Sequence, residues 1–167
     1  MKARLIATIL AVLCAAPVSA ATLMYDVASD SSTGVATTFD LAVGQTFSVN
    51  VIDRADTWIL GATPREFTAD GMEISGADYG NFGAFRYGTL VGRIGAGDAF
   101  AIGFGDTFMA ATSGILSLLN WDSAYGDNSG SIAVNVTSAV PVPAGGLLLL
   151  SALGLGGLAA RKRRKSA

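Results

Sequence analysis

Alternation of apolar and polar residues dominates the middle of the chain, and this pattern constrains the fold more than any other feature. Two segments show it most clearly, and in each of them every second residue shares one face: Phe47, Val49 and Val51, and then Ile132, Val134 and Val136. A period of two is what a strand with one buried face requires. The middle of the chain is therefore predicted to be an all-β domain.

Further apolar runs cover residues 87–95, 98–106 and 114–121, with Gly, Asp, Asn and Ser clusters between them. These clusters are typical of turns, so short strands are expected throughout. Only residues 62–71 are expected to hold a turn of helix. The glycine-rich residues 92–100 run from strand to strand and predict a hairpin rather than a phosphate-binding loop. Residues 21–138 are thus predicted to fold as a β-sandwich or jelly roll.

The first 20 residues have the parts of a secretory signal peptide. Lys2 and Arg4 precede an apolar run, Pro17 interrupts it, and small residues end at Ala20. We expect a signal helix that is removed after Ala20, since its apolar run is shorter than the roughly 20 residues that span a bilayer. Cys14, the only cysteine, lies in this segment. The mature chain would therefore have no disulfide and no thiolate chemistry.

The C-terminal segment consists of a linker at residues 139–143, an apolar run and a basic end. Residues 144–160 carry no charge, and a helix over them would span roughly 25 Å, enough for a thin membrane. Five bases follow within residues 161–167: Arg161, Lys162, Arg163, Arg164 and Lys165. Basic residues stay on the cytoplasmic side, so a transmembrane helix here would place the middle domain outside. A buried core helix is the alternative.

The linker and the residue after it also carry a proline motif: Val140, Pro141, Val142, Pro143 and Ala144. Together with the apolar run and the basic end, this motif resembles the PEP-CTERM sorting signal in its VPLPA-type variant from Gram-negative bacteria. The resemblance implies recognition, and cleavage near the motif, by an exosortase-type membrane protease. It also implies a protein anchored in the inner membrane until processing, and then located at the cell surface or in the extracellular matrix.

Charge excludes several classes of function for the middle domain. All 13 acids lie between Asp26 and Asp127, where only four bases occur, which leaves a net charge of −9. Such a domain should repel nucleic acid. Because the mature chain has neither His nor Cys, nucleophilic catalysis by a His-based triad and the usual zinc sites are excluded. We expect no enzyme, with a carboxylate pair for glycoside hydrolysis as a minor alternative.

One dense cluster of oxygen-bearing side chains lies in residues 118–131, between two predicted strands. It contains Asn120, Asp122, Asp127 and Asn128. Calcium ions take six to eight oxygen ligands from carboxylates, amides and carbonyls, so a loop of this composition suits Ca²⁺. A polar hairpin loop without a metal explains the composition equally well, because Asp, Asn, Gly and Ser favour turns.

Residues 87–95 and 113–136, and above all the segment YGDNSGS, resemble the C-terminal half of the galactophilic bacterial lectin family of the PA-IL type. The resemblance implies a galactose-binding-like β-sandwich in which sugar hydroxyls coordinate Ca²⁺. By position, it implies that Asp127 and Asn128 are side-chain ligands of the ion. Ala124 would supply a backbone carbonyl.

The same resemblance implies two further ligands. Its spacing puts the leading ligand at Asn120, whereas the nearest carboxylate is Asp122, and both positions stay open. A carbonyl near Thr57 or Trp58 would complete the shell. The family's His and Gln sugar contacts have no counterpart in residues 68–81. The resemblance therefore carries over the fold and the metal rather than a preference for galactose.

Trp121 and Tyr125 lie in the same loop. Either ring could stack on a sugar, or could cap the core of the sandwich instead. We therefore expect an exported, Ca²⁺-dependent, lectin-like module that binds a polysaccharide or other glycan. The alternative is a structural envelope or biofilm-matrix protein with a sandwich fold and no sugar binding.

Overall fold

The structure, a computed structural model, describes the backbone of residues 18–141 and the side chains of residues 20–138. Residues Ala20–Ala139 form one compact unit. The described residues form strands and no helix, which confirms the all-β prediction for them. In chain order the strands are β1 (Val18–Ala28), β2 (Val35–Leu41), β3 (Thr46–Val51), β4 (Trp58–Leu60), β5 (Arg65–Phe67), β6 (Asn81–Phe82), β7 (Phe85–Arg86), β8 (Leu90–Ile94), β9 (Phe100–Ala101), β10 (Gly105–Met109), β11 (Gly114–Asn120) and β12 (Ser129–Pro141).

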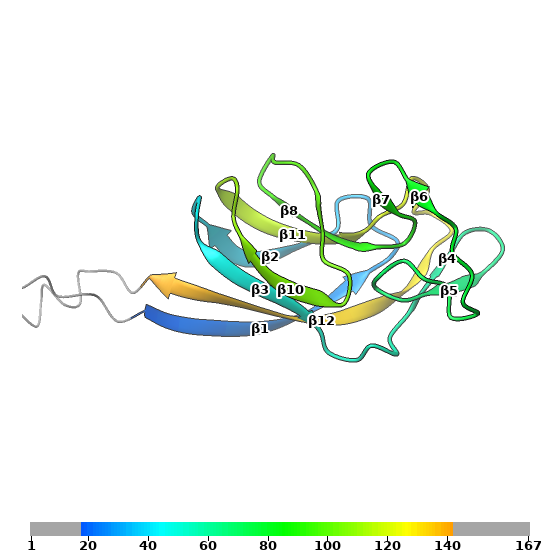
Figure 1. Ribbon diagram of the computed structural model, residues 1–167, viewed down its shortest axis with the longest axis horizontal. Helices are drawn as coiled ribbons and strands as arrows, with labels where there is room; N and C mark the ends of the chain where they lie inside the picture. The colour runs from blue at the N-terminus through cyan, green and yellow to red at the C-terminus, as the bar shows by residue number, and fades with distance from the viewer. Residues whose placement is uncertain (1–17, 142–167) are drawn as a thin grey trace, which may run out of the picture. The chain divides into compact units, whose positions relative to one another are not determined.

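The strands form two main sheets that lie over one another as a sandwich (Figure 1). The six-stranded sheet has the order β10-β3-β12-β4-β5, and β1 also pairs with β12. The four-stranded sheet has the order β2-β11-β8-β9, and β6 and β7 form a separate small hairpin. The predicted sandwich is therefore confirmed at the level of its layers.

Side chains that alternate along the central strands form the core. In the six-stranded sheet, Val136 of β12 lies opposite Val49 of β3. Both are fully buried, as are Leu116 and Leu118, which β11 contributes from the other sheet. Each large apolar side chain that is fully buried stabilises the fold by about 1.5–3 kcal/mol. The predicted alternation at β3 and β12 is thus confirmed.

The apolar run at residues 98–106 does not form a single strand. Its first part is β9, in the four-stranded sheet, and its last residues begin β10, in the six-stranded sheet. Gly103 lies between these strands and Gly105 begins β10, and their φ values are 58° and 128°. These values lie in the left-handed region that glycine occupies readily. The chain can therefore turn from one layer to the other within this run.

The predicted turn of helix at residues 62–71 is wrong, because this segment contains β5. Phe67 of β5 pairs with Trp58, and Arg65 pairs with Leu60, in an antiparallel register with β4. Pairing with β4 therefore overrides the local preference of this segment for a turn of helix. The predicted hairpin at residues 92–100 is confirmed, since Gly92 of β8 lies opposite Phe100 of β9. A Cβ at Gly92 would clash with the Phe100 ring.

Most of the terminal predictions lie outside the described residues. These are the signal helix up to residue 17, the transmembrane helix at residues 144–160, and the basic residues 161–165. The backbone of β12 continues through Val140 and Pro141, the first two residues of the predicted sorting motif. Within residues 18–141, no helix is long and apolar enough to cross a membrane.

Candidate functional site

The predicted calcium loop connects β11 with β12. Because β11 lies in the four-stranded sheet and β12 in the six-stranded one, the loop crosses between layers. The hairpin that the sequence also allowed is therefore wrong, since these two strands are not partners. At the start of the loop, the Trp121 amide donates to the Thr89 carbonyl at 2.8 Å, and the Trp121 carbonyl accepts from the Gly88 amide at 2.9 Å. Beyond Trp121, side chains of the loop supply many of the hydrogen bonds that its polar groups need.

Asp122 organises the loop through both of its carboxylate oxygens. Oδ1 accepts hydrogen bonds from the backbone amides of Ser123 and Ala124, at 2.5 and 3.1 Å. Oδ2 accepts one from the Tyr87 hydroxyl at 3.3 Å and one from the Asn128 side-chain amide at 2.9 Å. The carboxylate thereby holds the start and the end of the loop together, and it accepts four hydrogen bonds.

Asn128 ties the loop to two other turns. Its side chain is 9% exposed. Oδ1 accepts a hydrogen bond from the Gly61 amide at 3.2 Å, and Nδ2 donates to the Ser29 carbonyl at 3.1 Å as well as to Asp122. The Gly61 contact reaches the turn between β4 and β5, and the Ser29 contact reaches the end of β1. Asn128 is therefore a structural link at this end of the sandwich.

The field at this end is negative, as two tyrosines show. The pKa of Tyr87 is raised to about 12, mainly by burial, then by the charge and hydrogen bond of Asp122 and by the charge of Asp127. The pKa of Tyr125 is also raised, mainly by burial and further by the Asp122 charge, while a backbone hydrogen bond at Asp122 and the charge of Arg93 act in the other direction. The charges of Asp122 and Asp127 therefore both reach Tyr87, although burial is the larger cause of its raised pKa.

Asn120 is the buried polar side chain at this end of the sandwich that lacks a partner in the part of the chain that the structure describes. It ends the inward-facing row of β11 after Leu116 and Leu118, and its side chain is fully buried. Neither Oδ1 nor Nδ2 has a hydrogen-bond partner among the described residues. Leaving such a group unpaired costs about 1–3 kcal/mol, so buried amides are almost always paired. A bound ion or water beside Asn120 would satisfy the side-chain oxygen.

The remaining predicted ligands differ in their exposure. Asp127 is exposed, and its side chain makes no hydrogen bond within the described residues. Ala124 is exposed as well. Trp58 is fully buried and its indole donates to the Gly88 carbonyl at 3.0 Å, whereas the Thr57 carbonyl lies beside Gly130 at the start of β12.

Several oxygen donors lie in the loop and at its borders. Among the described residues, no three His, Cys, Asp or Glu side chains are grouped so as to hold a metal. The loop and its borders hold two carboxylates, two side-chain amides and backbone carbonyls, a composition that suits Ca²⁺. The structure thus places the predicted residues in one loop and at its borders, with Asp122 and Asn128 in direct contact.

Trp121 is held rigidly beside this loop. Its indole N–H donates to the Phe82 carbonyl. Its ring meets the Phe85 ring edge to face, with a centroid separation of 5.0 Å and an interplanar angle of 84°. Both partners belong to the β6–β7 hairpin, so this hairpin sets the orientation of the indole. The ring remains partly exposed, so it does not cap the core as Trp58 does.

Trp121 lines a cleft of about 490 Å³, called the polar cleft below because two charged side chains border it. The sequence did not predict this cleft. Phe85, Arg93 and Asp98 line it too, along with the backbone of residues 95–97. Arg93 comes from β8, and Asp98 from the connection between β8 and β9. The sequence held one indication of this cleft: Arg93 is one of only four bases between Asp26 and Asp127. A further cleft of about 370 Å³ shares Phe85 with the first one.

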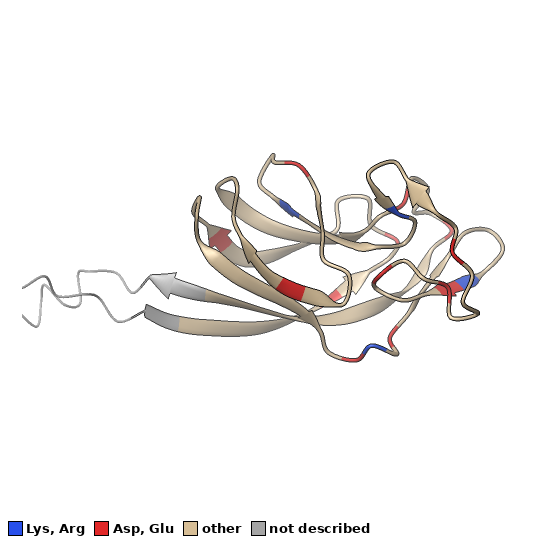
Figure 2. Ribbon diagram, viewed as in Figure 1, with Lys and Arg blue, Asp and Glu red and all other residues tan. Residues whose placement is uncertain are grey.

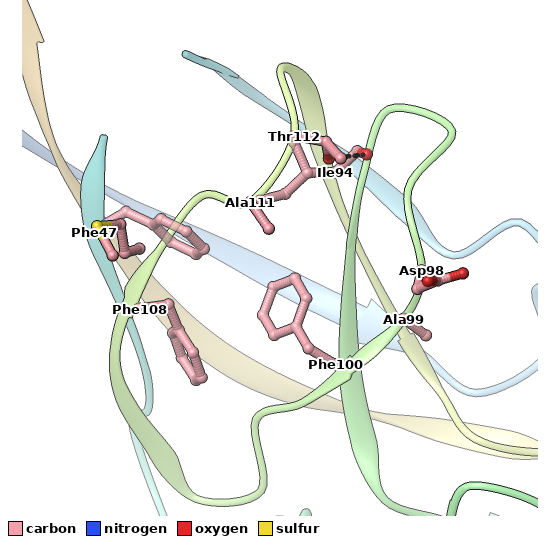
Figure 3. Close-up of a pocket in the computed structure, with 9 residues that line it drawn as sticks. Phe47, Ile94, Asp98, Ala99, Phe100, Phe108, Ala111 and Thr112 are labelled. Carbon is pink, nitrogen blue, oxygen red and sulfur yellow. Dashed lines mark hydrogen bonds between the residues drawn. The ribbon is translucent and has the colours of Figure 1, made fainter. Parts of the chain in front are cut away.

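An apolar pocket of about 310 Å³ lies on the other side of the segment that carries Asp98 (Figure 3). Its walls include the rings of Phe47, Phe100 and Phe108, whose centroids lie 5.1–6.1 Å apart. Figure 3 shows the Asp98 carboxylate pointing away from these rings. The residues that line this pocket include none of the predicted ligands, so it is separate from the calcium loop.

Comparison with known proteins gives one informative result. No family model matches the chain, and no curated protein matches it. Among solved structures, the fold is similar to that of the EclA N-terminal domain, described as a PllA-like lectin, with a TM-score of 0.54. The two sequences are 20% identical, and the match covers 70% of this chain and 95% of the other. This chain therefore has a lectin-like β-sandwich fold.

Proposed function

We propose that this protein is an exported carbohydrate-binding module whose β11–β12 loop binds Ca²⁺. The observation that carries the proposal is the similarity of the sandwich to a PllA-like lectin domain. The unpaired Asn120 amide and the two carboxylates that act on Tyr87 support a cation at this loop. The protein would bind a glycan and not cleave it.

Each residue of the loop has a part in this proposal. Asp122 and Asp127 would supply charge, Asn120 and Asn128 would supply amide oxygens, and Ala124 would supply its carbonyl. When bound, the ion would coordinate hydroxyl groups of a sugar directly. The hydrogen bonds from Ser123, Ala124 and Tyr87 would keep the Asp122 carboxylate in position.

A second candidate function, a structural envelope or matrix protein, is favoured by one observation. Every side-chain oxygen of Asp122 and Asn128 already accepts a hydrogen bond from the protein. The loop could therefore hold its shape without a metal. Under this alternative, the network joins the two sheets and no glycan is bound.

Thermal melting with calcium and with a chelator tests the metal site. The full chain, purified in mild detergent, should melt at a temperature at least about 3 °C higher in millimolar Ca²⁺ than in EGTA, because a ligand of the folded state stabilises it. Asp127→Ala should remove this shift and leave the melting temperature in EGTA unchanged. An equal shift in the variant, or none in the parent chain, would contradict the metal site.

Export and sorting are further parts of the proposal. They rest on the N-terminal signal pattern and on the C-terminal motif, apolar run and basic end. We infer an inner-membrane anchor that an exosortase-type protease processes near residues 140–144. Mass spectrometry of the protein from a host with such a protease should show loss of residues 161–167. A mature protein that keeps this basic end would contradict processing.

A further inference from the structure

The polar cleft is a different site from the calcium loop, and its basic residue faces outward from the four-stranded sheet. Arg93 of β8 lies opposite Ser117 of β11. Its neighbours Gly92 and Ile94 are buried, and Arg93 itself is exposed. Trp121 directly follows the end of β11 and lines the same cleft. A cation and an aromatic ring therefore meet on one outer face.

Arg93 differs from the other arginines of the described domain. Arg86 forms an ion pair with Asp78 at 3.3 Å, and the guanidinium groups of Arg54 and Arg65 lie over aromatic rings. Within residues 20–138, Arg93 makes no ion pair, hydrogen bond or ring contact. Figure 2 shows how sparse basic residues are beside the acidic ones. An unpaired guanidinium in so acidic a domain has its donors available for an anionic ligand.

The cleft offers two kinds of contact to such a ligand. A guanidinium presents a planar fork of N–H donors that matches a carboxylate with two parallel hydrogen bonds. The fixed Trp121 ring presents an apolar surface, against which the C–H groups of a sugar ring can pack. A volume of about 490 Å³ lies in the range of small-ligand sites. Asp98 could accept hydrogen bonds from sugar hydroxyls on the same rim.

We propose that this cleft binds an acidic sugar, a uronic acid residue of a polysaccharide, with its carboxylate on Arg93 and its ring against Trp121. The inference rests on the proposed function, because it names the class of glycan that the module recognises. Asp98 carries a charge of the same sign as the ligand, so it limits the affinity for the acidic sugar. Recognition at this cleft needs no calcium.

Tryptophan fluorescence of the full chain in mild detergent measures binding directly. The chain has two tryptophans, and Trp58 is fully buried, so a change on titration reports on Trp121. The probes are an oligogalacturonate and the matching neutral oligogalactoside, each titrated in EGTA. We expect the acidic probe to bind about tenfold more tightly at physiological salt, where the long-range repulsion between the acidic domain and the probe is screened.

Three variants assign the preference to the cleft. Arg93→Gln should lower the affinity for the oligogalacturonate about tenfold and leave the neutral probe unaffected, whereas Arg93→Lys should retain part of the preference. Asp98→Asn should strengthen binding of the acidic probe, because it removes a like charge. Arg54→Gln is the matched control, since Arg54 lines none of the three cavities described above and should leave binding unchanged.

The outcomes separate the inference from the proposed function. If neutral glycans bind and the acidic probe binds no more tightly, the acidic-sugar inference is overturned and the glycan-binding module stands. If Arg93→Gln binds the acidic probe as tightly as the parent chain, the inference is overturned as well. If neither probe binds in EGTA but a neutral glycan binds in Ca²⁺, only the inference fails. If no glycan binds in either condition, both fail.

Discussion

The β11–β12 loop and the neighbouring polar cleft share a border at Trp121, yet Asp122 and Asn128 of the loop are hydrogen-bonded within residues 20–138 and Arg93 of the cleft is not. In the loop, both carboxylate oxygens of Asp122 and both polar side-chain atoms of Asn128 form hydrogen bonds. In the cleft, Arg93 has no ion pair or hydrogen bond within the described residues. The loop therefore contributes to the stability of the sandwich, whereas the cleft keeps its charge available for a ligand.

The largest effect is expected where the loop is joined to other turns. Asn128→Ala should lower the free energy of unfolding by about 2–4 kcal/mol, because the Gly61 amide and the Ser29 carbonyl lose their partner. Urea denaturation in EGTA measures this loss. Asp127→Ala is the control and should change stability by less than about 0.5 kcal/mol, as expected of an exposed side chain. Equal losses of stability in the two variants would show that Asn128 stabilises the fold no more than Asp127 does.

A smaller effect of opposite sign is expected at Asn120. Asn120→Leu should raise the free energy of unfolding in EGTA by about 1–2 kcal/mol, because it removes an unpaired buried amide from an apolar row. The same variant should lose the thermal shift caused by Ca²⁺. A variant that is more stable and still responds to Ca²⁺ would show that Asn120 is not a ligand.

The negative field of the loop predicts a pH dependence. The Tyr87 pKa is raised above its ordinary value of 10.0, so the neutral phenol is favoured in the folded state. Its contribution to stability is therefore fully present below pH 10 and is lost as the pH rises to about 12. Ultraviolet absorbance of tyrosinate follows this titration. Asp122→Asn should lower the Tyr87 pKa, and Tyr87→Phe should remove the absorbance change that Tyr87 contributes. An unchanged Tyr87 pKa in Asp122→Asn would contradict the interaction between Tyr87 and the Asp122 carboxylate.

The smallest effect is expected in the cleft. Arg93→Gln should change the free energy of unfolding by less than about 0.5 kcal/mol, since Arg93 is exposed and makes no contact that the fold needs. Urea denaturation beside Asn128→Ala compares the two regions directly. A loss above 1 kcal/mol would mean that Arg93 belongs to the structural network after all.

Sequence patterns predicted the parts of this molecule that depend on neighbours along the chain. Alternation at β3 and β12 marked their buried faces correctly, because a strand exposes every second side chain to the same surroundings. The polar cluster at residues 118–131 was predicted to lie between two strands, and its residues 121–128 do connect β11 with β12. Its role as a crossing between sheets was not foreseen, since that depends on which strands are partners.

The polar cleft could not be predicted from the sequence, again because it depends on which strands pair. Arg93 and Trp121 are 28 positions apart in the sequence and meet because β8 pairs with β11. The Tyr87 contact with Asp122 likewise spans 35 positions. Local composition does not encode such contacts. Strand β5 shows a related effect, because pairing with β4 decided its conformation against the expected turn of helix.

Retention of the full chain on immobilised glycans, in Ca²⁺ and in EGTA, is the most direct test of the central claim. A panel should hold neutral and uronate-containing polysaccharides side by side, with Asp127→Ala as the metal-site variant. We predict that Ca²⁺ increases retention of the parent chain on at least one neutral glycan and leaves Asp127→Ala unaffected. A parent chain that is retained on no glycan in either condition would contradict the carbohydrate-binding function and favour the structural alternative.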